Sequence, residues 1–376
     1  MRIALVTDAV YPYSKGGKEM RTFELSTRLA KRGHEVHVYT MKWWPEDTLI
    51  KKENGVYLHA ICPLYEMHKD DKRVAKQGIL YGLACYKLFK EPFDVIEVDQ
   101  IPFFPLFSIK LVTLLRRKRL FITWHEVWGR DYWLKYLGFA GNIASIIEKT
   151  GSLLSRDIIA VSDHTAKELQ RILGYNHTVK KVLNGIDLSG FDSPPGTSDK
   201  TVDCLYAGRL IEHKNVDLLV QAIALLNAKQ GTPKVTCKII GEGRERSRLE
   251  ALSKKLGQSS YISFRDFLPK KEDLYKEMLA ARVFVTPSTR EGFGITILEA
   301  NACGTPVITS DDHNNAGRQL VLEGVTGTIC AAKAQAIAPA IRSWLNTKSD
   351  QNAIAMHARI YDWEAQVDRQ LEAYTS

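Results

Sequence analysis

The chain alternates between two hydrophobic patterns. Short apolar runs rich in β-branched residues are followed, almost from end to end, by segments whose apolar residues recur at helical spacing. This alternation predicts an α/β protein with helices on both faces of parallel sheets, and several runs are apolar enough for strands buried on both faces. In the first half of the chain, the predicted strands are residues 3–7, 35–40, 95–98, 120–124, 158–161 and 181–183.

The helical segments are defined by their apolar stripes. In the predicted helix 18–32, Leu25, Leu29 and Ala30 share one face, and Gly33 follows where a left-handed C-terminal cap is expected. A second series of strands and helices begins after residue 199, and its first helix is cleanly amphipathic. This series comprises predicted strands 202–206, 235–240, 262–264, 283–286 and 306–309, and predicted helices 216–227, 246–256 and 272–281.

The two series are separated by residues 192–199, whose two prolines, one glycine and small polar residues have the composition of a linker. We therefore expect two Rossmann-like, doubly wound domains, residues 1–190 and 191–357. A cleft between the domains, bordered by the carboxyl ends of the strands, would be the place for a ligand.

Composition narrows the class of protein. With 45% hydrophobic and 25% charged residues in 376, the chain is a folded globular protein rather than a disordered one. Its net charge of +9 could attract nucleic acid, anionic lipid or a phosphorylated substrate. The six cysteines form no C-x-x-C pair, so neither a disulfide framework nor a zinc site is indicated. Without a signal or membrane-spanning pattern, we expect a cytoplasmic protein.

The segment 288–300 is the richest in candidate chemistry, because a turn with two glycines leads from a strand into a helix. Such a turn lets backbone amides approach a phosphate at the helix N-terminus. Glu291 lies in the loop and Glu299 about one turn inside the helix, so the two carboxylates could reach different parts of one ligand. Two surface glutamates around a turn are the plainer interpretation.

Two further loops follow strands. Arg209 and Lys214, five residues apart before a helix, could clamp a pyrophosphate, although on these residues alone a solvated basic loop is the better interpretation. Gly16 and Gly17 lie between the first strand and the first helix, where glycines permit close backbone approach to a ligand. No G-x-G-x-x-G is present, so a nicotinamide-binding site is not supported.

In their order along the chain, these motifs resemble those of retaining glycosyltransferases of family 4, which have the GT-B fold. The strongest element of the resemblance is the pair Glu291 and Glu299, with seven residues between them, downstream of Arg209 and Lys214. The other matching motifs are Gly16-Gly17 with residues 29–30 and 33–36, Trp124-His125-Glu126, residues 161–162, 184–187, 208–210, 240–243 and 304–307.

The resemblance implies a role for each group of residues. Arg209 and Lys214 would neutralise the departing nucleoside diphosphate in place of a metal, so no cofactor and no metal are expected. Glu291 would contact the transferred sugar, Glu299 the ribose hydroxyls, and His125 would position the donor. The remaining expected donor-binding residues are Gly16, Gly17, Gly208, Gly241, Glu242, Gly243, Phe267, Leu268, Phe293, Gly294, Ile295 and Thr296.

The resemblance also implies a reaction mechanism and a position for the C-terminal helix. Retention by double displacement requires a carboxylate nucleophile, for which only Glu126 and Asp8 are candidates by motif order. We therefore favour departure and attack on the same face of the sugar. The helical stripe that includes Trp363 and Tyr374 suggests that residues 358–376 cross back onto the first domain, with hinges near residues 190 and 357.

We therefore expect a metal-independent enzyme that moves a hexose-type sugar from a UDP- or GDP-sugar to a hydroxyl of an envelope glycan or lipid-linked sugar. The alternatives are a GT-B nucleotide-sugar epimerase and a basic, non-catalytic protein that binds polyanions or membranes. No nucleic-acid motif is present, so nucleic acid is not an expected partner. The basic run 116–119 beside the aromatic segment 102–107 is either a solvated loop or a peripheral contact with the inner membrane surface.

Overall fold

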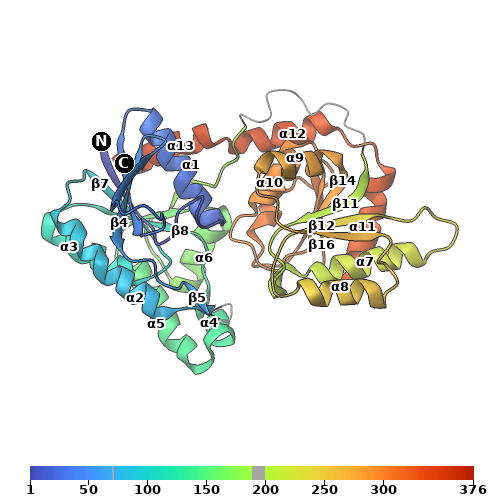
Figure 1. Ribbon diagram of the computed structural model, residues 1–376, viewed down its shortest axis with the longest axis horizontal. Coiled ribbons are helices and arrows are strands. Elements are labelled where there is room, and N and C mark those ends of the chain that lie inside the picture. The colour runs from blue at the N-terminus through green and yellow to red at the C-terminus, as the bar shows by residue number, and fades with distance from the viewer. Residues whose placement is uncertain (70–71, 189–199) are drawn as a thin grey trace. The chain divides into compact units, whose positions relative to one another are not determined.

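The computed structural model describes residues 1–69, 72–188 and 200–376. These residues form two compact units, one made of Met1–Asn184 and Trp363–Ser376 and the other of Gly185–Asp362 (Figure 1). The predicted linker 192–199 and the expected boundary at residue 190 lie outside the described residues. The chain returns to the first unit after Asp362 rather than at residue 357, because η5 (Arg359–Tyr361) still packs against α12 (Gln351–Ala358) of the second unit.

The first unit contains an eight-stranded sheet in the order β10-β9-β8-β7-β1-β2-β4-β3. Neighbouring strands are parallel except β3 and β4, which pair antiparallel at one edge. The central strands match the predicted apolar runs. The strand bounds are β1 Arg2–Val6, β2 Glu35–Met41, β3 Ile50–Glu53, β4 Val56–Cys62, β7 Val95–Asp99, β8 Leu120–Trp124, β9 Asp157–Ala160 and β10 Lys180–Lys181.

β3 and β4 were not among the predicted strands. β3 is the edge strand and β4 is its neighbour, and most residues of the two are partly or fully exposed, so β4 lacks the continuous apolar run of a central strand. A two-stranded ribbon, β5 (His68–Lys69) and β6 (Lys72–Arg73), was missed as well.

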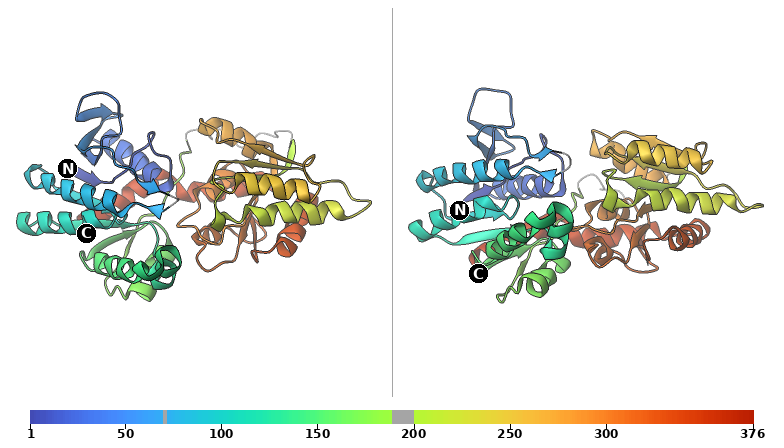
Figure 2. Two further views of the ribbon diagram at one scale, coloured as in Figure 1. Left: turned by 60° about the horizontal axis from the view of Figure 1, so that its bottom comes forward. Right: turned by 90° about the horizontal axis from the view of Figure 1, so that it is seen from below.

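Helices cover both faces of this sheet (Figure 2). The predicted helix 18–32 is α1 (Gly17–Lys31), and Gly33 has the left-handed conformation expected of its cap, with φ of 85°. α1 packs with α13 (Trp363–Thr375) on one face. The opposite face is covered by α2 (Ala75–Ala84), η1 (Cys85–Lys90), α3 (Phe104–Arg116), α4 (Gly129–Leu137), η2 (Gly138–Ala140), α5 (Gly141–Ser152) and α6 (Asp163–Leu173).

A buried polar network fixes α13 to the sheet. The Glu97 carboxylate, on β7, accepts hydrogen bonds from Gln370 Nε2 at 2.6 Å and from the Tyr374 hydroxyl at 2.5 Å. Arg21 of α1 donates to Gln370 Oε1 at 3.3 Å and to Asn184 Oδ1 at 3.1 Å. The network therefore joins α1, β7 and α13 with Asn184, the last residue of the segment Met1–Asn184.

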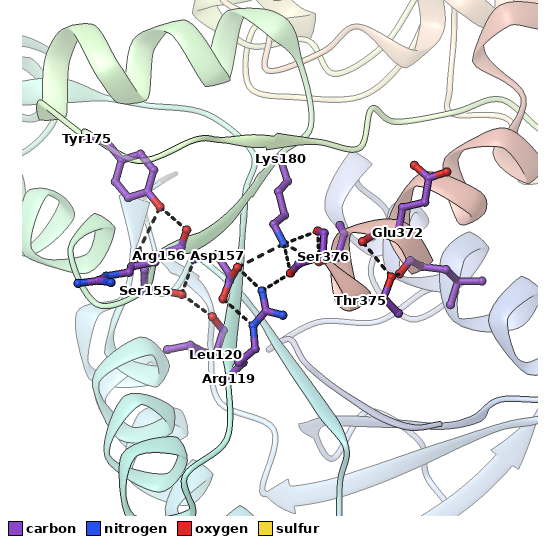
Figure 3. Close-up of polar contacts among 12 residues, drawn as sticks. Arg119, Leu120, Ser155, Arg156, Asp157, Tyr175, Lys180, Glu372, Thr375 and Ser376 are labelled. Carbon is purple, nitrogen blue, oxygen red and sulfur yellow. Dashed lines mark hydrogen bonds and ion pairs between the residues drawn. The ribbon is translucent and has the colours of Figure 1, made fainter.

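A second set of contacts holds the last residues of α13 against the sheet (Figure 3). Lys180 Nζ donates to the Ala373 carbonyl at 2.7 Å and to Ser376 Oγ at 2.9 Å. Arg119 Nη2 donates to the Ser376 carbonyl at 2.7 Å and to Asp157 Oδ1 at 2.6 Å. Side chains from β9, from β10 and from Arg119, the residue before β8, thus hold this end of the chain.

The second unit contains a fully parallel six-stranded sheet in the order β13-β12-β11-β14-β15-β16. In Figure 1, α9, α10 and α12 lie on one side of it and α7, α8 and α11 on the other. The last strand and α11 were not predicted. The bounds are β11 Val202–Ala207, η3 Glu212–Lys214, α7 Val216–Ala228, β12 Cys237–Ile240, α8 Arg246–Lys255, β13 Ile262–Arg265, α9 Lys271–Ala280, β14 Ala281–Thr286, α10 Ile295–Ala302, β15 Val307–Ser310, η4 Ala316–Leu320, β16 Gly327–Cys330 and α11 Ala334–Asn346.

Each sheet has a switch point where the direction of strand progression reverses. In the first unit β1 lies between β2 and β7, and in the second β11 lies between β12 and β14. At such a point, the loops that follow two neighbouring strands lead to opposite faces of the sheet. Ligands bind in the crevice that opens between these two loops. The loops after β1 and β7, and those after β11 and β14, are therefore the first places to look for a site.

Candidate active site

The loop after β11 carries Arg209 and Lys214. Arg209 is exposed, and its carbonyl accepts a hydrogen bond from the Tyr206 hydroxyl at 2.9 Å. Lys214 closes the short helix η3, and Asn215 follows in the left-handed conformation, with φ of 49°. Asparagine tolerates that region better than most residues. Asn215 therefore takes a backbone conformation here that glycine adopts more readily.

The loops after β11 and β14 are joined by an ion pair. Lys214 Nζ lies 2.5 Å from Glu291 Oε1, and each side chain is 15% exposed. Burial alone would raise the pKa of Glu291, but the charge and hydrogen bond of Lys214, with a hydrogen bond from Ser288, hold that pKa below its usual value. Glu291 is thus ionised at neutral pH, and two groups predicted to act on one donor lie in direct contact.

Backbone contacts make the two loops one piece. The Thr289 amide donates to the His213 carbonyl at 3.0 Å, and Asn215 Nδ2 donates to Thr289 Oγ1 at 3.1 Å. Burial, reinforced by the nearby Lys214 charge, lowers the pKa of His213 to about 4, so its ring is neutral at pH 7. The positive charge of these joined loops therefore comes from Arg209 and Lys214, with Arg290 beside them.

The N-terminus of α10 is built for close backbone approach. Gly294 precedes Ile295 with φ of 97°, and a Cβ at this position would come within 3.0 Å of the Gly317 Cα. The amides of the first turn, including those of Ile295 and Thr296, have no acceptor inside the helix, and the helix dipole is positive there. Phe293 is buried and its ring packs against Tyr361, so it anchors the loop.

Glu299 differs from Glu291 in its surroundings. It lies on α10, and its carboxyl is 8% exposed by residue and makes no hydrogen bond or ion pair with the residues that the structure describes. Burial raises its pKa, and Lys271 offsets this only in part. A buried carboxyl without a protein partner is costly unless a ligand supplies hydrogen-bond donors, which suits the expected contact with ribose hydroxyls.

The segment after β15 supports the Glu291 loop and was missed as a structural partner of it. The Glu291 amide donates to the Asn314 carbonyl at 3.1 Å, and the Glu291 carbonyl accepts from the Ala316 amide at 2.9 Å. The fully buried Asn315 donates from Nδ2 to Thr309 Oγ1 at 3.0 Å. A polar residue inside a polar run carries no sequence signal of burial, so only the fold reveals this role.

The glycines after β12 pack against the loop after β11. A Cβ on Gly241 would lie 1.9 Å from the Gly208 carbonyl oxygen, so these backbones touch directly. Glu242 Oε1 accepts a hydrogen bond from the Phe267 amide at 3.3 Å, and the Phe267 side chain is 46% exposed. The structure thus brings together Gly208, Gly241, Glu242, Gly243, Phe267 and Leu268 around the carboxyl ends of β11, β12 and β13.

In the first unit, the loop after β1 is organised by Asp8 rather than by the glycines. The fully buried Asp8 carboxylate accepts hydrogen bonds from Lys18, from Arg73 Nη1 at 2.8 Å and from Gln77 Nε2 at 3.0 Å. Burial opposes ionisation, but the two cations prevail and lower the pKa of Asp8 to about 2. Gly16 is the N-cap of α1, and Gly17 is the first residue of that helix. Asp8 therefore holds cations in place, which is a poor arrangement for a nucleophile.

His125 follows β8 and is held by the end of the neighbouring strand β7. His125 Nε2 lies 2.7 Å from Asp99 Oδ1, and the His125 amide donates to Gln100 Oε1 at 2.7 Å. Thr165 Oγ1 donates to the His125 carbonyl at 3.1 Å. Burial opposes ionisation of Asp99, yet His125 keeps the Asp99 pKa below its usual value. Asp99 and Gln100 were missed by sequence reasoning, although their place at the end of a predicted strand was a usable signal.

No group of three or more His, Cys, Asp or Glu side chains is placed to hold a metal ion in residues 1–69, 72–188 and 200–376. Described site residues thus fall into a set on the second unit, built around Lys214 and Glu291, and a set on the first unit, built around Asp8 and the Asp99–His125 pair.

Comparison with known proteins identifies two matching families, one for each half of the chain. Residues 15–189 match "Glycosyltransferase Family 4" and residues 192–360 match "Glycosyl transferases group 1". An uncharacterized glycosyltransferase of Methanocaldococcus jannaschii is 28% identical over 339 residues, which cover 82% of this chain and 80% of the relative. The alpha-monoglucosyldiacylglycerol synthase of Streptococcus pneumoniae is 25% identical over 97% of this chain and 83% of its own length.

A solved structure agrees in fold. The sucrose-phosphate synthase of Thermosynechococcus elongatus aligns with a TM-score of 0.79 and 20% identity over 100% of this chain and 98% of that one. Both halves of the chain, its two parallel sheets and the order of its motifs therefore lead to one conclusion: the chain belongs to glycosyltransferase family 4 and has the GT-B fold.

Proposed function

We propose that this glycosyltransferase moves a hexose-type sugar from a UDP- or GDP-sugar to a hydroxyl of a glycan or lipid-linked acceptor, with retention of anomeric configuration and without a metal. The observation that carries the proposal is the Lys214–Glu291 pair at 2.5 Å, next to the loop that begins α10. In this pair, Lys214, the cation proposed to bind the diphosphate, lies beside Glu291, the carboxylate proposed to bind the sugar.

The proposed reaction begins with cleavage of the bond between the anomeric carbon and the diphosphate oxygen. The bonding electrons leave with the diphosphate, and Arg209, Lys214 and the first-turn amides of α10 stabilise the developing charge. The acceptor hydroxyl attacks from the face that the diphosphate leaves, and its proton passes to the departing phosphate oxygen. This route needs no protein nucleophile, in keeping with Asp8 being occupied by Lys18 and Arg73.

Four side chains would contact the donor. Glu291, ionised beside Lys214, would accept hydrogen bonds from sugar hydroxyls, and the buried Glu299 would accept those of the ribose. His125, held by Asp99 at 2.7 Å, would contact the sugar and stabilise positive charge near the anomeric carbon. Phe267, exposed beside Glu242, would border the base.

The acceptor class is supported by the relatives and by the charge of the chain. The name of the Streptococcus pneumoniae relative gives a glucosylated diacylglycerol as its product. The net charge of +9 favours an anionic acceptor or surface. No specific observation favours an epimerase or a non-catalytic polyanion-binding protein.

The test is a transfer assay with EDTA present, in which UDP- and GDP-hexoses are offered with lipid-linked and soluble glycan acceptors. Release of nucleoside diphosphate and the anomeric configuration of the product are followed by NMR. We expect one donor to be used without metal and an α-linked donor to give an α-linked product. An inverted product, or activity that requires added metal, would overturn the proposal, and a Glu291→Gln variant controls for contaminating activity.

A further inference from the structure

The first unit carries an unusually apolar outer surface on two helical segments, α2–η1 and α3. The exposed large side chains gathered there are Ile79, Leu83, Tyr86, Phe89, Leu111, Leu114 and Leu115. Leu114 and Leu115 are 65% and 62% exposed, although they are adjacent to buried positions of the same helix. Isolated surface leucines need no explanation, but a contiguous apolar patch marks an interaction site.

These residues form one surface because the two segments run side by side (Figures 1 and 2). Near the start of α3, a Cβ on Gly78 would come within 3.0 Å of Pro102, and one on Gly82 within 2.9 Å of Phe104, so the backbones approach closely. Near its end, Arg116 donates to the Glu91 carbonyl. The two rows of apolar side chains therefore lie along neighbouring, similarly directed ridges, which we call the α2–α3 face.

The charge of the α2–α3 face is of one sign. Neither α2, η1 nor α3 contains an aspartate or glutamate. Lys87 and Lys90 are exposed at one end of η1, and Arg117 and Lys118 are exposed just after α3. None of these four side chains makes an ion pair with a residue that the structure describes. Lys87 Nζ, however, donates a hydrogen bond to the Ile61 carbonyl at 2.7 Å, so the cations that the face offers to a ligand are those of Lys90, Arg117 and Lys118. Basic side chains with long apolar stems beside exposed leucines are typical of surfaces that lie in a membrane interface.

The basic run noted in the sequence is therefore part of a larger surface, but its aromatic neighbours are not. Pro102, Phe103 and Leu106 are buried against the core of the unit, so they cannot touch a membrane. The apolar contribution comes instead from the second half of α3 and from α2–η1. No helix among the described residues is long and apolar enough to cross a bilayer.

We propose that the α2–α3 face docks on a bilayer containing anionic lipids, with the leucine rows at the level of the headgroups and Lys90, Arg117 and Lys118 against lipid phosphates. Charge complementarity selects this occupant. A protein partner with an acidic surface would leave the leucine rows unexplained, and a second copy would bring like charges together. The proposal goes beyond the catalysed reaction, and its test needs no transfer activity.

The experiment measures co-sedimentation of the full-length protein with vesicles of phosphatidylcholine, with or without phosphatidylglycerol. We expect binding to the anionic vesicles that weakens as salt is raised. The variant Arg117→Gln/Lys118→Gln should bind them about 25-fold more weakly, because each basic residue near an anionic surface contributes about a five-fold factor. The variant Leu114→Ser/Leu115→Ser should also lose binding, since it removes apolar burial and leaves the charge unchanged.

The matched control is Lys254→Gln/Lys255→Gln, which removes the same charge from the exposed end of α8 in the second unit. It should bind within about two-fold of the unchanged protein. The proposal is overturned if the unchanged protein does not bind anionic vesicles, or if the control loses as much binding as the α3 variant. It is also overturned if sedimentation velocity shows a dimer that the Leu114→Ser/Leu115→Ser variant cannot form, because the face would then join two copies.

Discussion

Replacing Lys214 by methionine should make the stability of the second unit depend on pH in a new way. In the unchanged protein, Lys214 holds the pKa of Glu291 below its usual value near 4.5. A carboxylate with a lowered folded-state pKa contributes stability that is present above about pH 4.5 and is lost as the pH falls through its folded pKa. Without Lys214, burial raises that pKa, so the ionised carboxylate becomes a penalty that grows as the pH rises.

The size of the effect follows from the exposure of the pair. Removing one partner of a fully buried ion pair costs about 3–5 kcal/mol, whereas an exposed pair contributes at most about 1 kcal/mol. With both side chains 15% exposed, we expect Lys214→Met to cost about 2 kcal/mol at pH 7. For a unit of this size, that loss corresponds to a fall in Tm of about 4–8 °C.

The assay is differential scanning calorimetry of the full chain at pH 5 and pH 7. In the unchanged protein, His213, whose pKa burial lowers to about 4, is already mostly neutral in this window. The Tm deficit of Lys214→Met should be larger at pH 7, and adding Glu291→Gln should remove the pH-dependent part because it removes the buried charge. A deficit that is equal at both pH values, or a double variant as pH-dependent as the single one, would refute this reasoning.

Five other substitutions, at four positions, test the site. Asp99→Asn keeps a hydrogen-bond acceptor beside His125 but removes the negative charge. In steady-state kinetics, its kcat should be about 10-fold lower with an unchanged KM for the donor. The kcat of Asp99→Leu, which also removes the acceptor, should be about 100-fold lower. In calorimetric titration, Glu299→Ala should bind the nucleotide about 30-fold more weakly, which is the value of one hydrogen bond to a charged group. Glu291→Ala should mainly lower turnover. Equal losses of nucleotide affinity in the two variants would contradict these roles. Gly241→Ala should abolish nucleotide binding or folding, as judged by thermal shift and circular dichroism, because its Cβ would lie 1.9 Å from a backbone oxygen.

The sequence was sufficient to predict the fold class and the loops that carry the second-unit site. Buried parallel strands need apolar runs, and a backbone that approaches within contact distance needs glycine, so β11, β14, Gly241 and Gly294 all leave local signals.

The parts that could not be predicted depend on contacts between distant segments. Asn315 is a polar residue in a polar run, and its burial follows only from the packing of the loop after β15 against Glu291. The hydrogen bond between Glu97 and Tyr374 joins residues 277 positions apart. The exposure of Leu114 and Leu115 could not be predicted either, because it depends on which face of α3 the rest of the unit covers.

The central claim is that the second unit binds a nucleoside diphosphate through Arg209 and Lys214 without a metal. The most direct test is calorimetric titration of UDP, GDP and ADP into the protein in EDTA, repeated with Arg209→Gln, whose exposed side chain can be changed without disturbing the core. We expect one nucleotide to bind without metal and Arg209→Gln to bind it at least about 10-fold more weakly, as loss of a charge-assisted hydrogen bond requires. Binding that appears only with Mg²⁺, or that Arg209→Gln leaves unchanged, would contradict the central claim.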